Sequence, residues 1–344
     1  MIFTLTSKLP VILQIGENLF PQIDKIIQQH NLLFTNKLVV TMPQIYEVCA
    51  DSVEVIQGHK FFIHSNNVSE AEKLIEYLHT ISPDTLVLAV GGGQVIDVVK
   101  HAATKLNINY LSVPTALSND GIYSPVSVLS DGIRRIRVGA NIPLGIIVDL
   151  PIVQKAPPYT LKSGIGDILS NQNALLDWQI AKAQKGELIN DFAYTLSNMC
   201  VQSLRKLEPS NFNNLDFCSQ VAHLLVMSGL AMEIAGTSRP CSGAEHSISH
   251  AIDELYPNRA TAHGLQVAAA TVMMLRLHKQ DTDHIITFMR DLGMPVGLQE
   301  LGFNISEITK ILRYAQNIRH RFTIINTIDI NESLVERIDT SEQT

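Results

Sequence analysis

The chain has 344 residues, of which 46% are hydrophobic and 17% charged, a composition that provides for packed cores and excludes a largely disordered protein. Because this length exceeds that of one typical domain, we expect two domains. The formal net charge of −7 argues against a protein whose main task is to bind nucleic acid, since a polyanionic partner requires a basic surface.

The cysteines and the N-terminal segment indicate a soluble, cytoplasmic protein. The first residues lack the basic region and cleavage site of a signal peptide, and no apolar run is expected to reach membrane-spanning length. The cysteines are scattered and form no Cys-x-x-Cys pair, which is typical of buried thiols in a reducing compartment. They are Cys49, Cys200, Cys218 and Cys241.

The first half of the chain alternates strand-like and helical stretches. Strands are predicted at residues 11–15, 37–42, 60–63, 85–90, 109–113, 133–139 and 145–149. Helices are predicted at residues 19–30 and 94–106, and a further helix opens at Ser69 in a capping box with Glu72. This alternation predicts a doubly wound α/β layer around a parallel sheet.

Three consecutive glycines, Gly91, Gly92 and Gly93, lie between the buried strand 85–90 and the helix 94–106. A glycine turn between strand and helix lets backbone N–H groups approach a phosphate, and the helix N-terminus adds the positive end of its dipole. The pattern is not the G-x-G-x-x-G fingerprint, and a simple tight turn would look the same. We expect a phosphate-binding turn.

The segments after this turn add polar groups. Asp97 is expected in the first helical turn, where its charge favours the helix dipole, and Lys100 is expected to be solvated. The next strand ends in the polar loop 114–121, PTALSNDG, followed by Ser124. Ligands bind at the carboxyl edge of open α/β sheets, so this loop is a candidate binding segment, although ordinary turn chemistry favours the same residues.

Past Pro151 and Pro157 the sequence changes to long helical periodicities. We therefore place a domain boundary near residue 155, with domains at 1–155 and 156–344. Helices are predicted at residues 159–185, 188–207 and 217–235, with others from residue 264 onward.

A candidate metal site lies in this second half. His246 and His250 are one helical turn apart and share a face, and His263 follows after a Pro-Asn break. Two imidazoles with the carboxylate of Asp167 would hold a divalent metal with open positions, leaving the third imidazole for proton transfer. The glycines beside Asp167 cost helix stability, which suggests close approach of the backbone to a ligand. Three solvated or structural histidines would give the same spacing.

Four blocks in the same order resemble the sn-glycerol-1-phosphate dehydrogenase family. They are GGGQVIDVVK, PTALSNDGIYSPVS, SGIGDILSNQNALLDWQIA and SGAEHSISHAID with a following HG. The resemblance covers about residues 8–330, and this family lies in the superfamily of iron-type alcohol dehydrogenases, glycerol dehydrogenase and dehydroquinate synthase. It implies a Rossmann-like α/β N-terminal domain, an all-helical C-terminal domain and a dehydroquinate synthase-like architecture.

The resemblance also implies roles for individual residues. The metal ligands would be Asp167, His246 and His263, with zinc the expected ion and nickel or iron as alternatives. His250 and Asp120 would contact the substrate, although glycerol dehydrogenase relatives take a metal ligand from the position of His250. An NAD or NADP cofactor would be bound by Gly91, Gly92, Gly93, Gln94, Ile96, Asp97, Thr115, Ser118 and Ser124.

The implied reaction is the reversible reduction of dihydroxyacetone phosphate to sn-glycerol 1-phosphate, a step of phospholipid metabolism. Residues 40–43 offer neither an acid nor an arginine to the cofactor ribose, so they do not choose between NAD and NADP. Arg239 and Arg259 are candidates for the substrate phosphate, or simply solvated loop residues. The alternatives are a polyol or amino-sugar dehydrogenase and a dehydroquinate synthase-like cyclase. We expect a homo-oligomer without nucleic-acid partners.

Overall fold

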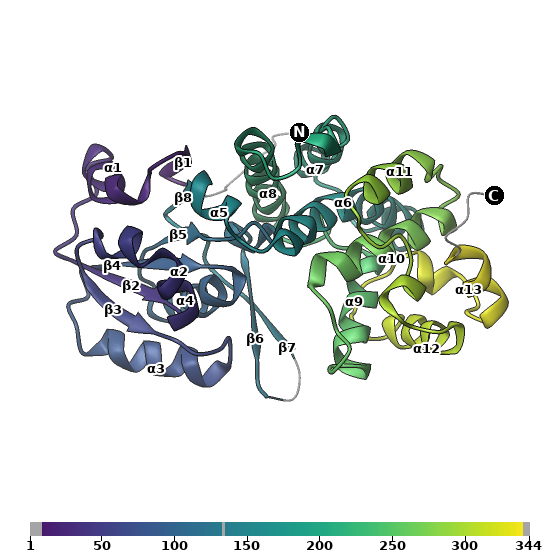
Figure 1. Cartoon of the computed structure of the whole chain (residues 1–344). Helices are drawn as coiled ribbons and strands as arrows, with labels where there is room; N and C mark the ends of the chain where they lie inside the picture. Colours follow the sequence, from purple (N-terminus) through teal and green to yellow (C-terminus); the bar gives the residue numbers. More distant parts are fainter. Residues whose placement is uncertain (1–8, 133–134, 340–344) are drawn as a thin grey trace, which may run out of the picture. The chain divides into compact units, whose positions relative to one another are not determined.

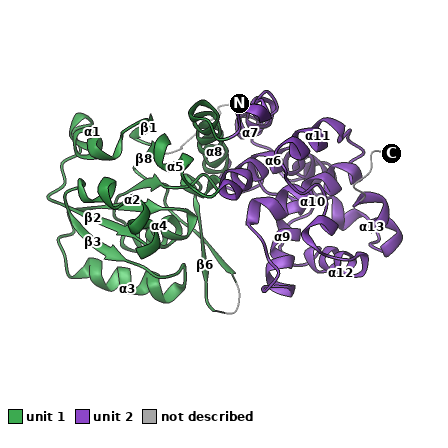
Figure 2. Ribbon diagram, viewed as in Figure 1, with its two compact units in different colours: residues 1–157, 213–233 green, residues 158–212, 234–344 purple. Residues whose placement is uncertain are grey.

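The computed structural model describes residues 9–132 and 135–339 (Figure 1). The chain divides into two compact units (Figure 2). The first comprises the described part of residues 1–157 together with 213–233, and the second comprises 158–212 with the described part of 234–344. The first break lies near the boundary expected at residue 155, whereas residues 213–233 group with the first unit although the expected second domain includes them.

The first unit is built on a six-stranded parallel sheet with the order β1-β8-β5-β4-β2-β3. Its strands are β1 (Ile12–Gly16), β2 (Asn36–Thr41), β3 (His59–Phe62), β4 (Thr85–Gly91), β5 (Tyr110–Pro114) and β8 (Gly145–Asp149). All seven residues of β4 are buried, as a strand inside a parallel sheet requires. The predicted doubly wound α/β layer is confirmed.

Helices cover both faces of this sheet (Figure 1). They are η1 (Phe20–Gln22), α1 (Ile23–Gln29), α2 (Pro43–Glu54), α3 (Val68–His79), α4 (Gly93–Leu106) and the short α5 (Leu150–Gln154). One face carries a cluster in which Phe20 and Val53 pack with Leu88 of β4. The alternate residues of β4 point to the opposite face, and α4 packs against both β4 and α3.

Two local predictions need correction. The helix α3 begins at Val68 and its N-cap is Asn67, with no side-chain cap, so the predicted capping box from Ser69 to Glu72 is wrong. The strand predicted at 133–139 is β7 (Arg135–Gly139), and residues 133 and 134 lie outside the described part of the chain. It pairs antiparallel with β6 (Val126–Ser130), a strand that the sequence pattern did not indicate.

The second unit consists of helices. They are α6 (Pro158–Lys185), α7 (Asp191–Leu204), η3 (Pro209–Asn211), α9 (Ala244–Leu255), α10 (His263–Leu277), α11 (Asp283–Asp291), η4 (Gln299–Leu301), α12 (Ile305–Ala315), η5 (Ile324–Thr327) and α13 (Glu332–Ile338). Apolar residues from α9, α10 and α12, such as Ile248, Met273 and Leu312, form its core. The expected all-helical character of this region is confirmed within the described residues.

One helix of the first unit, α8 (Leu215–Ala235), is long and apolar enough to cross a membrane, contrary to the expectation that no run reaches this length. Two thirds of its most apolar window, 67%, is buried inside the protein, which is typical of a core helix. Gly229 lets α8 approach a loop of the same unit, since a Cβ at this position would lie 3.0 Å from the backbone nitrogen of Ser124.

Candidate metal and nucleotide sites

Three helices of the second unit bring together the residues predicted as metal ligands. Asp167 lies on α6, His246 on α9 and His263 at the first position of α10. One ligand atom from each residue lies within 4.8 Å of the other two. The closest named pair is His246 Nε2 and Asp167 Oδ1, 3.4 Å apart. The Asp167 side chain is only 4% exposed, so its carboxylate lies in a largely water-excluded place.

Close packing of α6 against α10 explains this convergence. A Cβ on Gly264 would overlap the carbonyl oxygen of Ser163, and a Cβ on Gly166 would overlap the carbonyl oxygen of Gly264. The two glycines therefore let the helices touch directly beside His263 and Asp167, because Gly264 follows His263 and Gly166 precedes Asp167. The expectation that the glycine beside Asp167 admits a ligand is wrong for Gly166, because a neighbouring helix fills the space.

The third histidine belongs to the same cluster. The ring of His250 is centred 6.2 Å from that of His246 and stacks on that of His263 at 5.7 Å. His250 also forms a second possible ligand group with Asp253 and His263, again with ligand atoms within 4.8 Å of one another. The structure thus gathers all three histidines, and both sets of possible ligands share His263.

A buried carboxylate beside the cluster escaped the sequence analysis. Glu245 is fully buried and its Oε1 lies 2.8 Å from Nδ1 of His246. Burial alone would lower the pKa of His246, but its hydrogen bonds to Asp167 and Glu245 outweigh burial and hold the pKa above its usual value. Burial would raise the pKa of Glu245, but its bonds with His246 and with the Gly243 N–H hold that pKa below its usual value.

The glycine turn of the first unit forms the candidate nucleotide site. Gly92 is the N-cap of α4, directly after β4, and a Cβ there would meet nothing within 4 Å. Gly91 differs, because a Cβ there would lie 2.5 Å from Cγ2 of Val95. The first glycine thus serves packing, and the second leaves the helix N-terminus accessible, as an anion-binding turn requires.

The other predicted cofactor residues surround this turn unevenly. Gln94 is exposed, whereas Ile96 is fully buried, so its side chain belongs to the core. Thr115 N–H donates to the Gly91 carbonyl at 3.2 Å, which ties the polar loop to the turn. Ser118 and Asp120 are partly buried in that loop, Ser124 is 4% exposed, and Gly93 lies near Asn119.

A buried lysine fastens the loop to α4, and its surroundings correct two expectations. Lys100 is fully buried, not solvated, and its Nζ donates to the carbonyls of Gly121 and Val126, each at 2.8 Å. Asp97, 3.4 Å from Lys100 Nζ, lies beyond the first turn of α4. Burial raises the pKa of Asp97 to about 6, against the influence of the Lys100 charge, and burial lowers the pKa of Lys100.

Comparisons with known proteins show the family to which this chain belongs. The sequence model of the family described as iron-containing alcohol dehydrogenase matches residues 14–157. Glycerol-1-phosphate dehydrogenase (NAD(P)+) of Methanothermobacter thermautotrophicus is 35% identical over 88% of this chain and 88% of that protein. The same enzyme of Staphylothermus marinus is 35% identical over 96% of this chain and 95% of that protein. The chain belongs to the glycerol-1-phosphate dehydrogenase family.

Solved structures with lower identity share the fold of this family member. Glycerol dehydrogenase from Schizosaccharomyces pombe has a TM-score of 0.80 at 21% identity, covering 98% of this chain and 90% of the other. Sulfoacetaldehyde reductase from Bifidobacterium kashiwanohense, solved in complex with NAD+, has a TM-score of 0.77 at 16% identity. The match covers 99% of this chain and 100% of the other. The family resemblance and the dehydroquinate synthase-like architecture are confirmed.

The two arginines suggested for the substrate phosphate both have protein partners in this glycerol-1-phosphate dehydrogenase family member. Arg259 donates to Glu307 at 2.6 Å, and its side chain is 41% exposed. Arg239 is buried, pairs with Glu187 and donates to the Phe322 carbonyl. Neither arginine therefore has its guanidinium reserved for a ligand.

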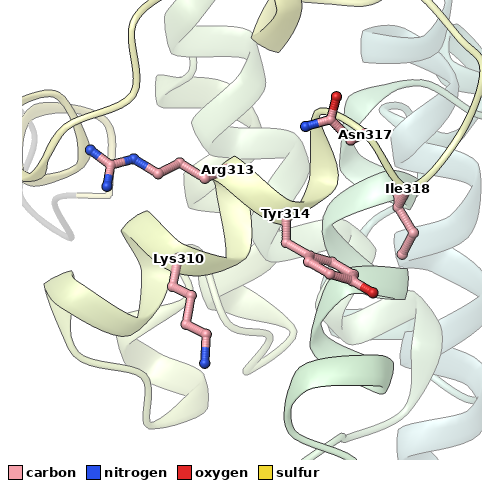
Figure 3. A pocket seen from close by; sticks show the side chains of 5 residues that line it. All are labelled: Lys310, Arg313, Tyr314, Asn317 and Ile318. Carbon is pink, nitrogen blue, oxygen red and sulfur yellow. The ribbon is translucent and has the colours of Figure 1, made fainter.

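An open cavity of about 430 Å³ lies along α12 of this family member (Figure 3). Its lining side chains project in different directions, and no predicted site residue is among them. They are Lys310, Arg313, Tyr314, Asn317 and Ile318. Several of these side chains have partners on other segments. Arg313 donates to the Ile330 carbonyl, Tyr314 donates to Glu254, and Lys310 Nζ lies 5.7 Å from the centre of the Tyr256 ring.

Proposed function

We propose that the protein is a metal-dependent, NAD(P)-linked oxidoreductase that interconverts dihydroxyacetone phosphate and sn-glycerol 1-phosphate. The proposal is carried by the meeting of one carboxylate and two imidazoles in a chain of this family. The relatives that support it are named glycerol-1-phosphate dehydrogenase (NAD(P)+), and they match this chain over most of their length.

The donor set of Asp167, His246 and His263 fits a divalent metal. One carboxylate oxygen and two imidazole nitrogens are ligands that zinc accepts in catalytic sites, where positions remain open for substrate, and nickel or iron accept them too. A divalent ion bound there supplies Lewis-acid polarisation of a carbonyl oxygen, and reduced nicotinamide supplies hydride. The remaining tasks belong to the protein's own side chains.

His250 is the candidate for proton transfer at the substrate oxygen. It is 4% exposed and its ring lies between 5.7 and 6.2 Å from the rings of His263 and His246, centre to centre. An imidazole can gain or release a proton near neutral pH, so His250 can protonate the alkoxide that hydride transfer leaves. Asp120, from the first unit, is the candidate for binding a substrate hydroxyl.

The turn at Gly92 and the N-terminus of α4 are the candidate seat of the cofactor pyrophosphate. The segment after β2 offers neither an acid nor an arginine, which supports a site that accepts NAD or NADP. The four free, buried cysteines support a cytoplasmic location.

The test is a substrate panel on metal-loaded enzyme. Oxidation of NADH or NADPH is followed at 340 nm with dihydroxyacetone phosphate, dihydroxyacetone and, in the reverse direction, glycerol. We expect turnover with the phosphorylated substrate. Turnover of unphosphorylated substrates alone would indicate a polyol dehydrogenase, and phosphate release without a net change in absorbance would indicate a cyclase.

A further inference from the structure

The hydrogen-bond partners of His246 and His263 determine which ring nitrogen each histidine can present to a metal. For His246, Nε2 faces Asp167 and Nδ1 lies 2.8 Å from Oε1 of Glu245. An ionised carboxylate only accepts hydrogen bonds, so Nδ1 of His246 carries a hydrogen. Nε2 is then the nitrogen that can bind a metal.

Glu245 is itself held in place by the second unit. Its Oε1 accepts the Gly243 N–H at 2.6 Å, and its Oε2 accepts the side-chain amide of Asn173. The same amide reaches Oδ2 of Asp177 at 3.2 Å. Both carboxylates and Asn173 are fully buried. Because several donors fix Glu245 from different sides, its carboxylate cannot swing away from His246 without breaking buried hydrogen bonds.

A different relay acts on His263. Its Nδ1 lies 2.8 Å from the hydroxyl oxygen of Ser249, and that hydroxyl donates to Oε1 of Gln266 at 2.6 Å. The orientation of the Gln266 amide is fixed because its nitrogen donates to the Thr261 carbonyl at 3.3 Å. The single hydroxyl hydrogen of Ser249 is thus used, so its oxygen accepts a hydrogen from Nδ1 of His263.

We propose that Glu245 and Ser249 are positioning residues that hold His246 and His263 as Nδ1–H tautomers, with Nε2 of both rings directed to the metal. This inference rests on the proposed metal role of Asp167, His246 and His263. Glu245 has the larger effect, because a hydrogen bond to a charged acceptor is stronger than one to a hydroxyl and makes the imidazole a better donor to a cation.

A purely structural role makes a different forecast. Glu245 also accepts the N–H of Gly243, so it could serve only to hold the start of α9. In that case its replacement would lower the melting temperature and leave the affinity for metal unchanged. Metal affinity therefore separates the two roles, and activity is not needed as the readout.

The experiment measures the dissociation constant of Zn²⁺ by chelator competition, using the full chain stripped of metal. We expect Glu245→Gln to weaken binding about 10- to 100-fold and Ser249→Ala to weaken it less. The matched control is Asp149→Asn, which alters another buried carboxylate, one that accepts the N–H groups of Leu19 and Phe20 in the first unit. This control should lower the melting temperature without changing the Zn²⁺ affinity.

The variants distinguish a failure of the positioning role of Glu245 from a failure of the metal site itself. If His246→Ala loses Zn²⁺ while Glu245→Gln binds it as wild type does, the positioning role is overturned and the metal site stands. If His246→Ala binds Zn²⁺ with wild-type affinity, both are overturned. Should Glu245→Gln fail to fold, ¹⁵N NMR of the histidine rings in Zn²⁺-loaded wild-type protein still decides, because a hydrogen on Nε2 of His246 would contradict the proposal.

Discussion

The two candidate sites are built from different parts of the chain. In the first unit the glycine turn offers backbone N–H groups at the start of α4, and a buried lysine holds the neighbouring loop. In the second unit the cluster consists of side chains from α6, α9 and α10, far apart in sequence. A site made of backbone N–H groups depends on the path of the chain, whereas a site made of side chains depends on the identity of each residue. Substitutions should therefore affect the two sites in different ways.

The largest effect is expected for the metal ligands. Asp167→Asn, His246→Ala and His263→Ala should each lose bound metal and lower kcat/KM by roughly 10³-fold or more, because Lewis-acid stabilisation contributes several kcal/mol. Elemental analysis of the purified variants alongside the activity assay measures both. A variant that keeps its metal and turns over normally would remove that residue from the ligand set.

His250→Ala should lower kcat by about 10²- to 10⁴-fold and keep the metal, because it removes proton transfer and not a ligand. Metal content and kcat are measured on the same preparation. If this variant loses metal while His246→Ala retains it, the ligand set is instead His250, Asp253 and His263, which the geometry also brings together.

Substitutions of Gly264 and Gly92 should differ in their effect on the stability of the protein. Gly264→Ala should reduce the free energy of unfolding by about 3 kcal/mol, because its Cβ would overlap a carbonyl of α6 and the gain in helix propensity is only about 1 kcal/mol. Gly92→Ala should leave the stability nearly unchanged, since its space is open and its φ is −77°, but should raise the KM for NAD(P)H. Denaturant unfolding and cofactor titration measure these effects. Equal stability of the two variants would contradict the packing argument.

The smallest effect is a change in how stability depends on pH. The pKa of Asp97 is raised to about 6 in the folded protein, so the folded state holds this proton more tightly than the unfolded state does. The contribution to stability is present below pH 4 and is lost as the pH rises from about 4 to 6. Asp97→Asn should lose this decline, measured as melting temperatures across that range. The same pH slope in both proteins would contradict it.

The sequence predicted the α/β layer and the helical half because periodicity reports which face of each element is buried. It also indicated that His246 and His250 share a helix face. Lys100 was misjudged because its partners, the carbonyls of Gly121 and Val126, come from a loop whose path depends on tertiary packing. Glu245 gave no signal because a glutamate in a first helical turn usually faces solvent and stabilises the helix dipole. Its burial likewise depends on tertiary packing.

Helix α8 has a consequence for any attempt to divide the molecule. The chain passes from one compact unit to the other after residues 157, 212 and 233, so no single cut yields the two units as separate polypeptides. A fragment beginning at residue 158 would carry α8 without the loop at Ser124 against which Gly229 packs. Its apolar surface would then be exposed to water, and we expect such a fragment to aggregate unless residues 9–157 are supplied as a second chain.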